Sequence, residues 1–132
     1  MTTSDLPAEG QPDVSTEGSE APFDDVITLS TSTNEDGVVT VTVVGEVDTF
    51  TAPVLRSTLD SQLEQQPKEL VIDLSGVQFL GSAGLAVLVE TQKSSRSREV
   101  GLSLVATTRA VTRPLEVTGL IDLFTIVDSS AR

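Results

Sequence analysis

The sequence predicts a single α/β domain with a mixed, mostly parallel sheet of four or five strands packed against helices. Apolar and β-branched runs alternate with longer segments of helical periodicity after an N-terminal hairpin, as in parallel strands joined by right-handed crossovers. The chain has 132 residues, enough for one core. Only 3% of them are aromatic, so the core must consist of Val, Leu, Ile and Ala, which suits buried parallel strands.

The expected strands follow from apolar and β-branched runs. They are residues 26–32, 38–44, 70–74, 100–105 and 123–127. The first two are joined by a turn that ends in glycine, which predicts a hairpin with the first strand at an edge. Asp73 is the one polar residue of the third strand, and we expect Asp73 and Ser75 to hydrogen-bond to backbone in the turn that follows it.

Three segments have the spacing of amphipathic helices, namely 52–65, 83–95 and 108–117. The apolar stripe of the first helix is predicted to consist of Val54, Leu55, Leu59 and Leu63. Thr49 or Thr51 can cap this helix. In the third helix, Pro114 predicts a bend or an interruption, because proline lacks the N–H that the helix needs.

Composition excludes several classes of function. A net charge of −12 repels nucleic acid phosphates and anionic lipid, so we expect no direct nucleic acid or membrane partner. The chain has no cysteine and no histidine, which removes disulfides, thiolate or imidazole metal sites and the Ser-His-Asp triad. The sequence therefore predicts a protein that is not an enzyme and needs neither metal nor cofactor.

The N-terminal segment differs in composition from the rest of the chain. Residues 1–22 contain no Lys or Arg and consist mainly of acidic, small polar, Gly and Pro residues. This predicts a disordered acidic tail, with the domain in residues 23–132. The start of the chain lacks the features of a signal peptide, and the absence of cysteine suits the cytoplasm, where we expect the protein to be located.

Residues 79–85, Phe-Leu-Gly-Ser-Ala-Gly-Leu, place four small residues where a buried strand gives way to a helix. Ser82 can be the helix N-cap. A nucleophile elbow would need glycine at position 80 and a histidine, and the chain has neither. The turn could also bind an anion through the N–H groups of the helix N-terminus, although no Lys or Arg lies next to it in the sequence. Finally, Ser82 can accept a phosphate from a kinase, because small neighbours allow close approach and a helix N-terminus tolerates the charge.

Asp48 ends the second strand and leads into the first helix. Two interpretations are balanced. The carboxylate can cap the helix, which is common at a strand-to-helix turn. It can also contact a partner, because we expect it near the same end of the sheet as Ser82.

These stretches resemble the STAS domain family of anti-sigma factor antagonists. The main match is VIDLSGVQFLGSAGLAVLVE (71–90), in which an apolar strand and Asp-Leu-Ser precede a small, serine-containing turn. The pieces VVGEVDTFTAPVL (43–55) and GLSLV…TRPLEVTGLIDLF (101–124) support it by their order and spacing. The resemblance covers residues 26–127, nearly all of the predicted domain.

The resemblance implies a regulatory switch. Family members bind an anti-sigma factor that is also a serine kinase, free the sigma factor and so regulate transcription indirectly. Phosphorylation of a serine at the start of the second helix ends the capture, and a serine phosphatase restores it. The phosphoacceptor maps onto Ser82, and the partner-binding residues map onto Asp48, Gly81, Ser82, Ala83 and Gly84.

The chain departs from the family pattern in three places. Gly81 stands where an Asp often precedes the serine, and Ala83 stands where a Ser or Thr often follows, so Ser82 has the one hydroxyl of the turn. Members often end in a further helix, which we expect to be short or missing in residues 128–132. The alternative function is a STAS scaffold or small-ligand-binding module that is never phosphorylated.

Overall fold

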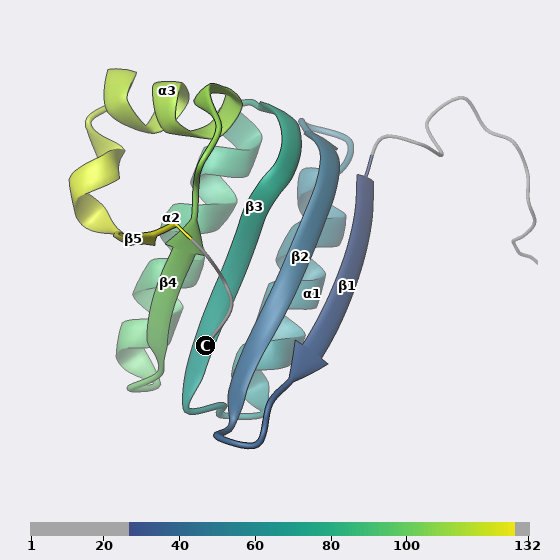
Figure 1. Cartoon of the computed structure of the whole chain (residues 1–132), viewed down its shortest axis with the longest axis vertical. Coiled ribbons are helices and arrows are strands. Elements are labelled where there is room, and N and C mark those ends of the chain that lie inside the picture. The colour runs from purple at the N-terminus through teal and green to yellow at the C-terminus, as the bar shows by residue number, and fades with distance from the viewer. Residues whose placement is uncertain (1–26, 129–132) are drawn as a thin grey trace, which may run out of the picture.

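A computed structural model describes residues 27–128, in which a five-stranded sheet has helices α1 and α2 on one face (Figure 1). The elements are β1 (Ile27–Thr33), β2 (Val38–Val47), α1 (Ala52–Glu64), β3 (Glu69–Leu80), α2 (Ser82–Ser97), β4 (Gly101–Val105), α3 (Arg109–Val117), the 3-10 helix η2 (Leu120–Leu123) and β5 (Thr125–Val127). The strand order is β1-β2-β3-β4-β5. The predicted fold class is confirmed. The predicted tail at residues 1–22 and the end of the chain after residue 128 lie outside the described residues.

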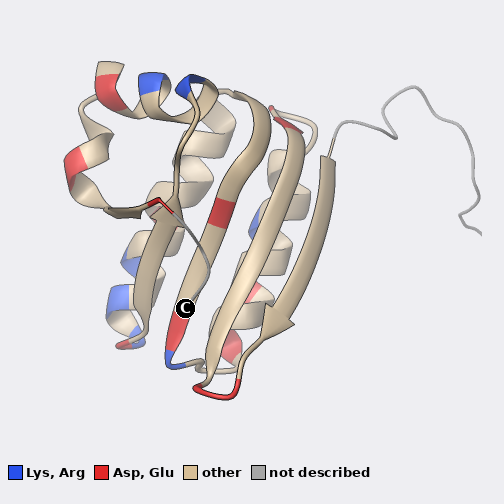
Figure 2. Cartoon of the chain, viewed as in Figure 1, with Lys and Arg blue, Asp and Glu red and all other residues tan. Residues whose placement is uncertain are grey.

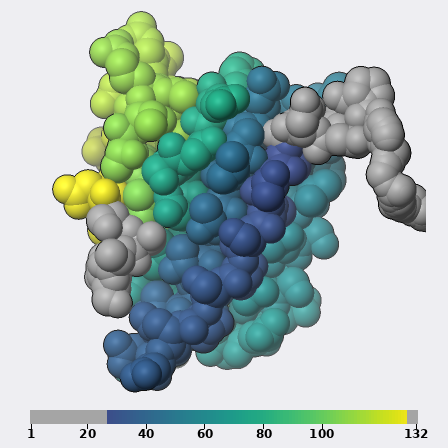
Figure 3. All heavy atoms as spheres, turned by 45° about the vertical axis from the view of Figure 1, so that its right-hand side comes forward, coloured from purple at the N-terminus to yellow at the C-terminus, as the bar shows by residue number. Residues whose placement is uncertain are grey.

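The hairpin is the antiparallel part of the sheet. β1 runs antiparallel to β2, whereas β2, β3, β4 and β5 are parallel to one another. β1 forms an outer edge and lies at the surface (Figure 3). Because Ile27 pairs with Gly45, β1 begins beside the carboxyl end of β2.

The core lies between the sheet and the helices α1 and α2. Along β2 the valines at positions 39, 41 and 43 are buried, whereas the threonines between them are only half-buried, which is the period of a strand with one covered face. The covered face of α1 consists of Ala52, Leu55, Leu59 and Leu63. Val54, which we predicted in this stripe, is 49% exposed, because its position turns it away from the sheet.

β3 is longer than predicted. It continues to Leu80 rather than ending at residue 74, because two register shifts against β2 absorb the polar segment without ending the pairing. Asp73 Oδ1 accepts hydrogen bonds from the backbone N–H of Ser75 at 3.0 Å and from its hydroxyl at 2.6 Å. The expected bonding is therefore confirmed, but it lies inside a strand and not in a turn after it.

α3 crosses the end of the sheet near β3 (Figure 1). Pro114 does not interrupt it, since the helix runs on to Val117 and the Pro114 carbonyl accepts the N–H of Thr118 at 3.2 Å. The helix ends before Gly119, whose φ of 77° is left-handed and favours glycine. The predicted interruption at Pro114 was therefore wrong, and the predicted end of the helix at residue 117 is confirmed.

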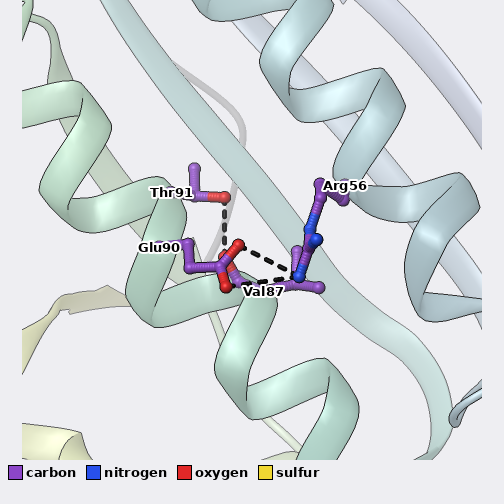
Figure 4. A network of polar contacts seen from close by, with 4 residues as sticks. All are labelled: Arg56, Val87, Glu90 and Thr91. Atoms are coloured by element: carbon purple, nitrogen blue, oxygen red, sulfur yellow. Dashed lines mark hydrogen bonds and ion pairs between the residues drawn. The ribbon is translucent and has the colours of Figure 1, made fainter.

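A polar contact joins α1 to α2 on the outside of the helical layer (Figure 4). The guanidinium of Arg56 lies 3.1 Å and 3.2 Å from the two carboxylate oxygens of Glu90. Both side chains are about half exposed, so solvent screening limits the contribution of the pair to less than about 1 kcal/mol. Beside it, the buried Thr91 hydroxyl donates to the Val87 carbonyl at 2.8 Å, which satisfies its polar group within the helix.

A substitution at Gly84 tests how closely α2 packs on the sheet. A Cβ at this position would lie 2.6 Å from Cγ1 of Val47 and 2.7 Å from Cδ1 of Leu80, both buried. We expect Gly84→Ala to lower the free energy of unfolding by about 1–2 kcal/mol, because overpacking outweighs the ~1 kcal/mol gained in helix propensity. Urea denaturation measures the change.

The matched control is Gly101→Ala in β4, where the nearest atom to a new Cβ would be Cγ of Glu69 at an ordinary 3.5 Å. We expect this variant to stay within about 0.5 kcal/mol of the wild type. Equal effects at positions 84 and 101 would show that the contact between α2 and the sheet is looser than described.

Candidate functional site

The carboxyl ends of β2 and β3 meet at one edge of the sheet. Val47 pairs with Leu80, and the N–H of Gly81 donates to the Val47 carbonyl at 2.9 Å. Asp48 and Ser82 are the next residues along their two chains. The expectation that they lie at the same end of the sheet is therefore confirmed.

Ser82 is exposed and is the first residue of α2. The interpretation of Ser82 as the N-cap was wrong: the N-cap is Gly81, whose extended backbone directs its carbonyl to the N–H of Leu85 at 3.0 Å. Among residues 27–128, no group forms a hydrogen bond with the Ser82 hydroxyl. The structure thus leaves this oxygen accessible at the positive end of a helix dipole.

The other small residues of the turn have different surroundings. Gly81 and Ala83 are half-buried, and Gly84 is buried. A Cβ on Gly81 would lie 3.1 Å from Cε2 of Phe79, so the ring of Phe79 lies directly beside this glycine. Of the four, only Ser82 is exposed. Gly84 packs directly against the side chains of Val47 and Leu80 and so holds the turn close to the sheet.

Asp48 organises the turn between β2 and α1. Its Oδ1 accepts the backbone N–H of Phe50 at 2.9 Å and that of Thr51 at 3.0 Å. Thr51 occupies the N-cap position of α1, but its hydroxyl accepts the N–H of Asp48 and donates to the Glu46 carbonyl, both at 2.9 Å, and does not cap the helix. Asp48 therefore does not cap α1, as one interpretation expected, but holds the turn before the helix, and its half-buried carboxylate keeps part of its surface open.

A groove runs along α2 from Ser82 to Lys93, with Leu120 of η2 as its other wall. Its floor is apolar and includes Leu85 and Val89. We call it the α2 groove. Sequence reasoning did not find it, because Leu120 follows Ser82 by almost forty positions and only the fold brings the two together.

The described part of the chain offers no group of three or more His, Cys, Asp or Glu residues that could hold a metal ion. None of its helices combines the length and the apolar character needed to cross a bilayer.

The family model for the STAS domain matches residues 30–132. The chain belongs to the STAS domain family. The match includes β3, the small-residue turn and α2, which carry the site.

Named relatives of this STAS domain are similar over most of its length. The anti-sigma-F factor antagonist RsfB of Mycobacterium tuberculosis is 35% identical over 100 residues, which cover 76% of this chain and 80% of that protein. The anti-sigma-B factor antagonist of Bacillus subtilis is 35% identical over 106 residues, or 80% and 93%. The crystal structure of an anti-sigma factor antagonist from Mycobacterium paratuberculosis superposes with a TM-score of 0.74 at 40% identity, covering 83% of this chain and 91% of that one.

The hydrogen bonds of Asp48 lead to a stability prediction. Asp48→Ala removes the acceptor of two backbone N–H groups in the turn before α1, and we expect a loss of about 1–2 kcal/mol in the free energy of unfolding. Asp48→Asn retains an acceptor oxygen and should lose clearly less. Chemical denaturation compares the two with Asp60→Ala, a control on the exposed side of α1. If all three variants were equally stable, the carboxylate would have no part in holding the turn.

Proposed function

We propose that this STAS domain protein is an anti-sigma factor antagonist: it binds an anti-sigma factor of the serine kinase type in the cytoplasm and releases the sigma factor. Phosphorylation of Ser82 ends the capture, and a serine phosphatase restores it. The observation that carries this proposal is the exposed Ser82 hydroxyl at the start of α2, which has no hydrogen-bond partner among residues 27–128. The names of the relatives support the antagonist role.

The contact surface of the proposal is the edge around Ser82. Asp48, Gly81 and Ala83 each keep some exposed surface there, whereas Gly84 acts from beneath by keeping α2 close to β2 and β3. The α2 groove begins at Ser82, so the surface available to the partner extends along the helix. A kinase that captures this edge can reach the hydroxyl because its neighbours are small.

Phosphorylation transfers the γ-phosphoryl group of ATP to Oγ of Ser82, with loss of the hydroxyl proton to a base of the kinase and release of ADP. The new group carries about −1.5 to −2 charges near neutral pH. At the N-terminus of α2 this charge is favourable, and Gly81 rather than Ser82 makes the N-cap, so the fold persists. At the interface the phosphate must lose water and needs new hydrogen-bond donors, which opposes binding.

The test is a binding series with candidate anti-sigma factor kinases from the protein's own organism. Isothermal titration calorimetry compares wild type, Ser82→Ala, Ser82→Glu and the phosphorylated protein. We expect wild type and Ser82→Ala to bind alike and the phosphorylated form to bind at least ~30-fold more weakly, equivalent to about 2 kcal/mol. Ser82→Glu should fall between, and Ser61→Glu, an exposed control on α1, should bind like the wild type.

Mass mapping after incubation with kinase and ATP locates the phosphate. Modification of Ser75 or of a serine before residue 27, and not of Ser82, would contradict the assignment. Equal affinity of all forms would favour the alternative of an unregulated STAS scaffold or ligand-binding module.

A further inference from the structure

Most of the large exposed apolar side chains of residues 27–128 belong to segments that meet at or near the site edge, where Glu46 pairs with Phe79 and Val47 with Leu80. Five large ones are exposed, and four of these lie near the carboxyl ends of β2 and β3, in the turn before α1 or in its first turn: Val44, Phe50, Val54 and Phe79. We call these four the apolar patch. The fifth, Val117, lies on α3. Singly scattered apolar residues are normal on a protein surface, whereas a cluster marks an interaction site.

The two phenylalanines are the largest members of the patch. Phe50 is 77% exposed and Phe79 is 51% exposed, although the chain has only four phenylalanines and no Trp or Tyr. Of the three phenylalanines in residues 27–128, these two are therefore exposed and Phe124 is buried. Large aromatic side chains of this kind dominate the binding energy of protein interfaces.

Both rings are attached to backbone that the fold holds in place. Phe79 pairs with Glu46 in the sheet, and its ring lies beside Gly81, where a Cβ would approach within 3.1 Å. Phe50 lies in the turn that Asp48 fixes through its hydrogen bond to the Phe50 N–H. A partner therefore orders little backbone when it covers these rings, which favours binding.

The charges around the patch indicate the chemistry of its partner. Within residues 44–55 and 75–89 the charged side chains are Glu46 and Asp48, both acidic, and Arg56, the next residue of α1, is already paired with Glu90. Lys and Arg gather at the C-terminal end of α2 and on α3 (Figure 2). A complementary surface is therefore an apolar pocket with Lys or Arg at its rim.

We propose that Phe50 and Phe79 are the anchors of the complex with the anti-sigma factor kinase, entering an apolar pocket with a basic rim on that partner. This inference rests on the proposed function and names the residues that recognise the partner. Because only Gly81 and Leu80 separate Phe79 from Ser82 in the chain, a phosphate on Ser82 enters the same dry contact as the anchor. Its desolvation opposes the burial of the Phe79 ring, so release needs no unfolding.

The anchors recognise the kinase but take no part in phosphoryl transfer. Phe50→Ser and Phe79→Ser should therefore weaken capture and raise KM for phosphorylation of Ser82 without changing kcat. The matched control is Val117→Ser, since Val117 is 72% exposed, comparable to Phe50, but lies on α3. Phe79→Leu is a second variant that keeps an apolar side chain beside Gly81.

The experiment uses the full chain and the anti-sigma factor kinase that binds the wild type in the calorimetric series. We expect each Phe→Ser change to raise Kd at least ~10-fold, and the KM for Ser82 phosphorylation by a similar factor, with kcat within about 2-fold. Val117→Ser should change Kd less than ~2-fold, and Phe79→Leu should recover part of the affinity. Thermal midpoints confirm that each variant is folded.

The outcomes separate the two proposals. If the wild type binds the kinase and both Phe→Ser variants bind it with the same Kd, the anchor role is overturned and the proposed function remains intact. An equal loss in Val117→Ser, or a fall in kcat with unchanged KM, would also overturn it. If no kinase binds the wild type, the proposed function is overturned, and the anchor role of Phe50 and Phe79 is overturned with it.

Discussion

The end of the parallel pairing between β2 and β3 determines the position of everything at the candidate site. Val47 and Leu80 are the last partners, and the bond from Gly81 N–H to the Val47 carbonyl extends the pairing by one residue to the start of α2. α2 can then approach the two strands only because Gly84 has no side chain between itself and Val47 or Leu80. The turns that carry Asp48 and Ser82 are adjacent as a consequence of this packing.

The choice of Gly81 as N-cap separates the structure of the turn from its chemistry. If the Ser82 oxygen capped α2, a phosphate on it would remove a hydrogen bond of the helix. Because the Gly81 backbone begins the helix, the Ser82 hydroxyl forms no hydrogen bond that holds the fold of residues 27–128. A switch at this position can change the surface charge while leaving the fold in place, which suits a protein whose family works through binding.

Charge and apolar surface are distributed unevenly over the domain. The helices α1 and α2 are linked by the half-exposed pair of Arg56 and Glu90, which adds little to stability. The edge around Ser82 combines acidic groups with two exposed aromatic rings. In the proposed complex, the net charge of −12 favours the approach of a basic partner, and the exposed rings supply contact area that charge alone does not.

The sequence by itself determined the fold class, the order of the main strands and helices and the position of the serine in its small-residue turn, because hydrophobic periods and small-residue motifs are local properties of the chain. It also placed Asp48 and Ser82 at one edge, since parallel strands share an end. Only the tertiary structure decided the length of β3, where register shifts against β2 carry the strand through Asp73 and Ser75. It likewise decided that Val54 and Phe79 are exposed and that Leu120 closes the α2 groove, because burial depends on contacts between segments that are distant in the sequence.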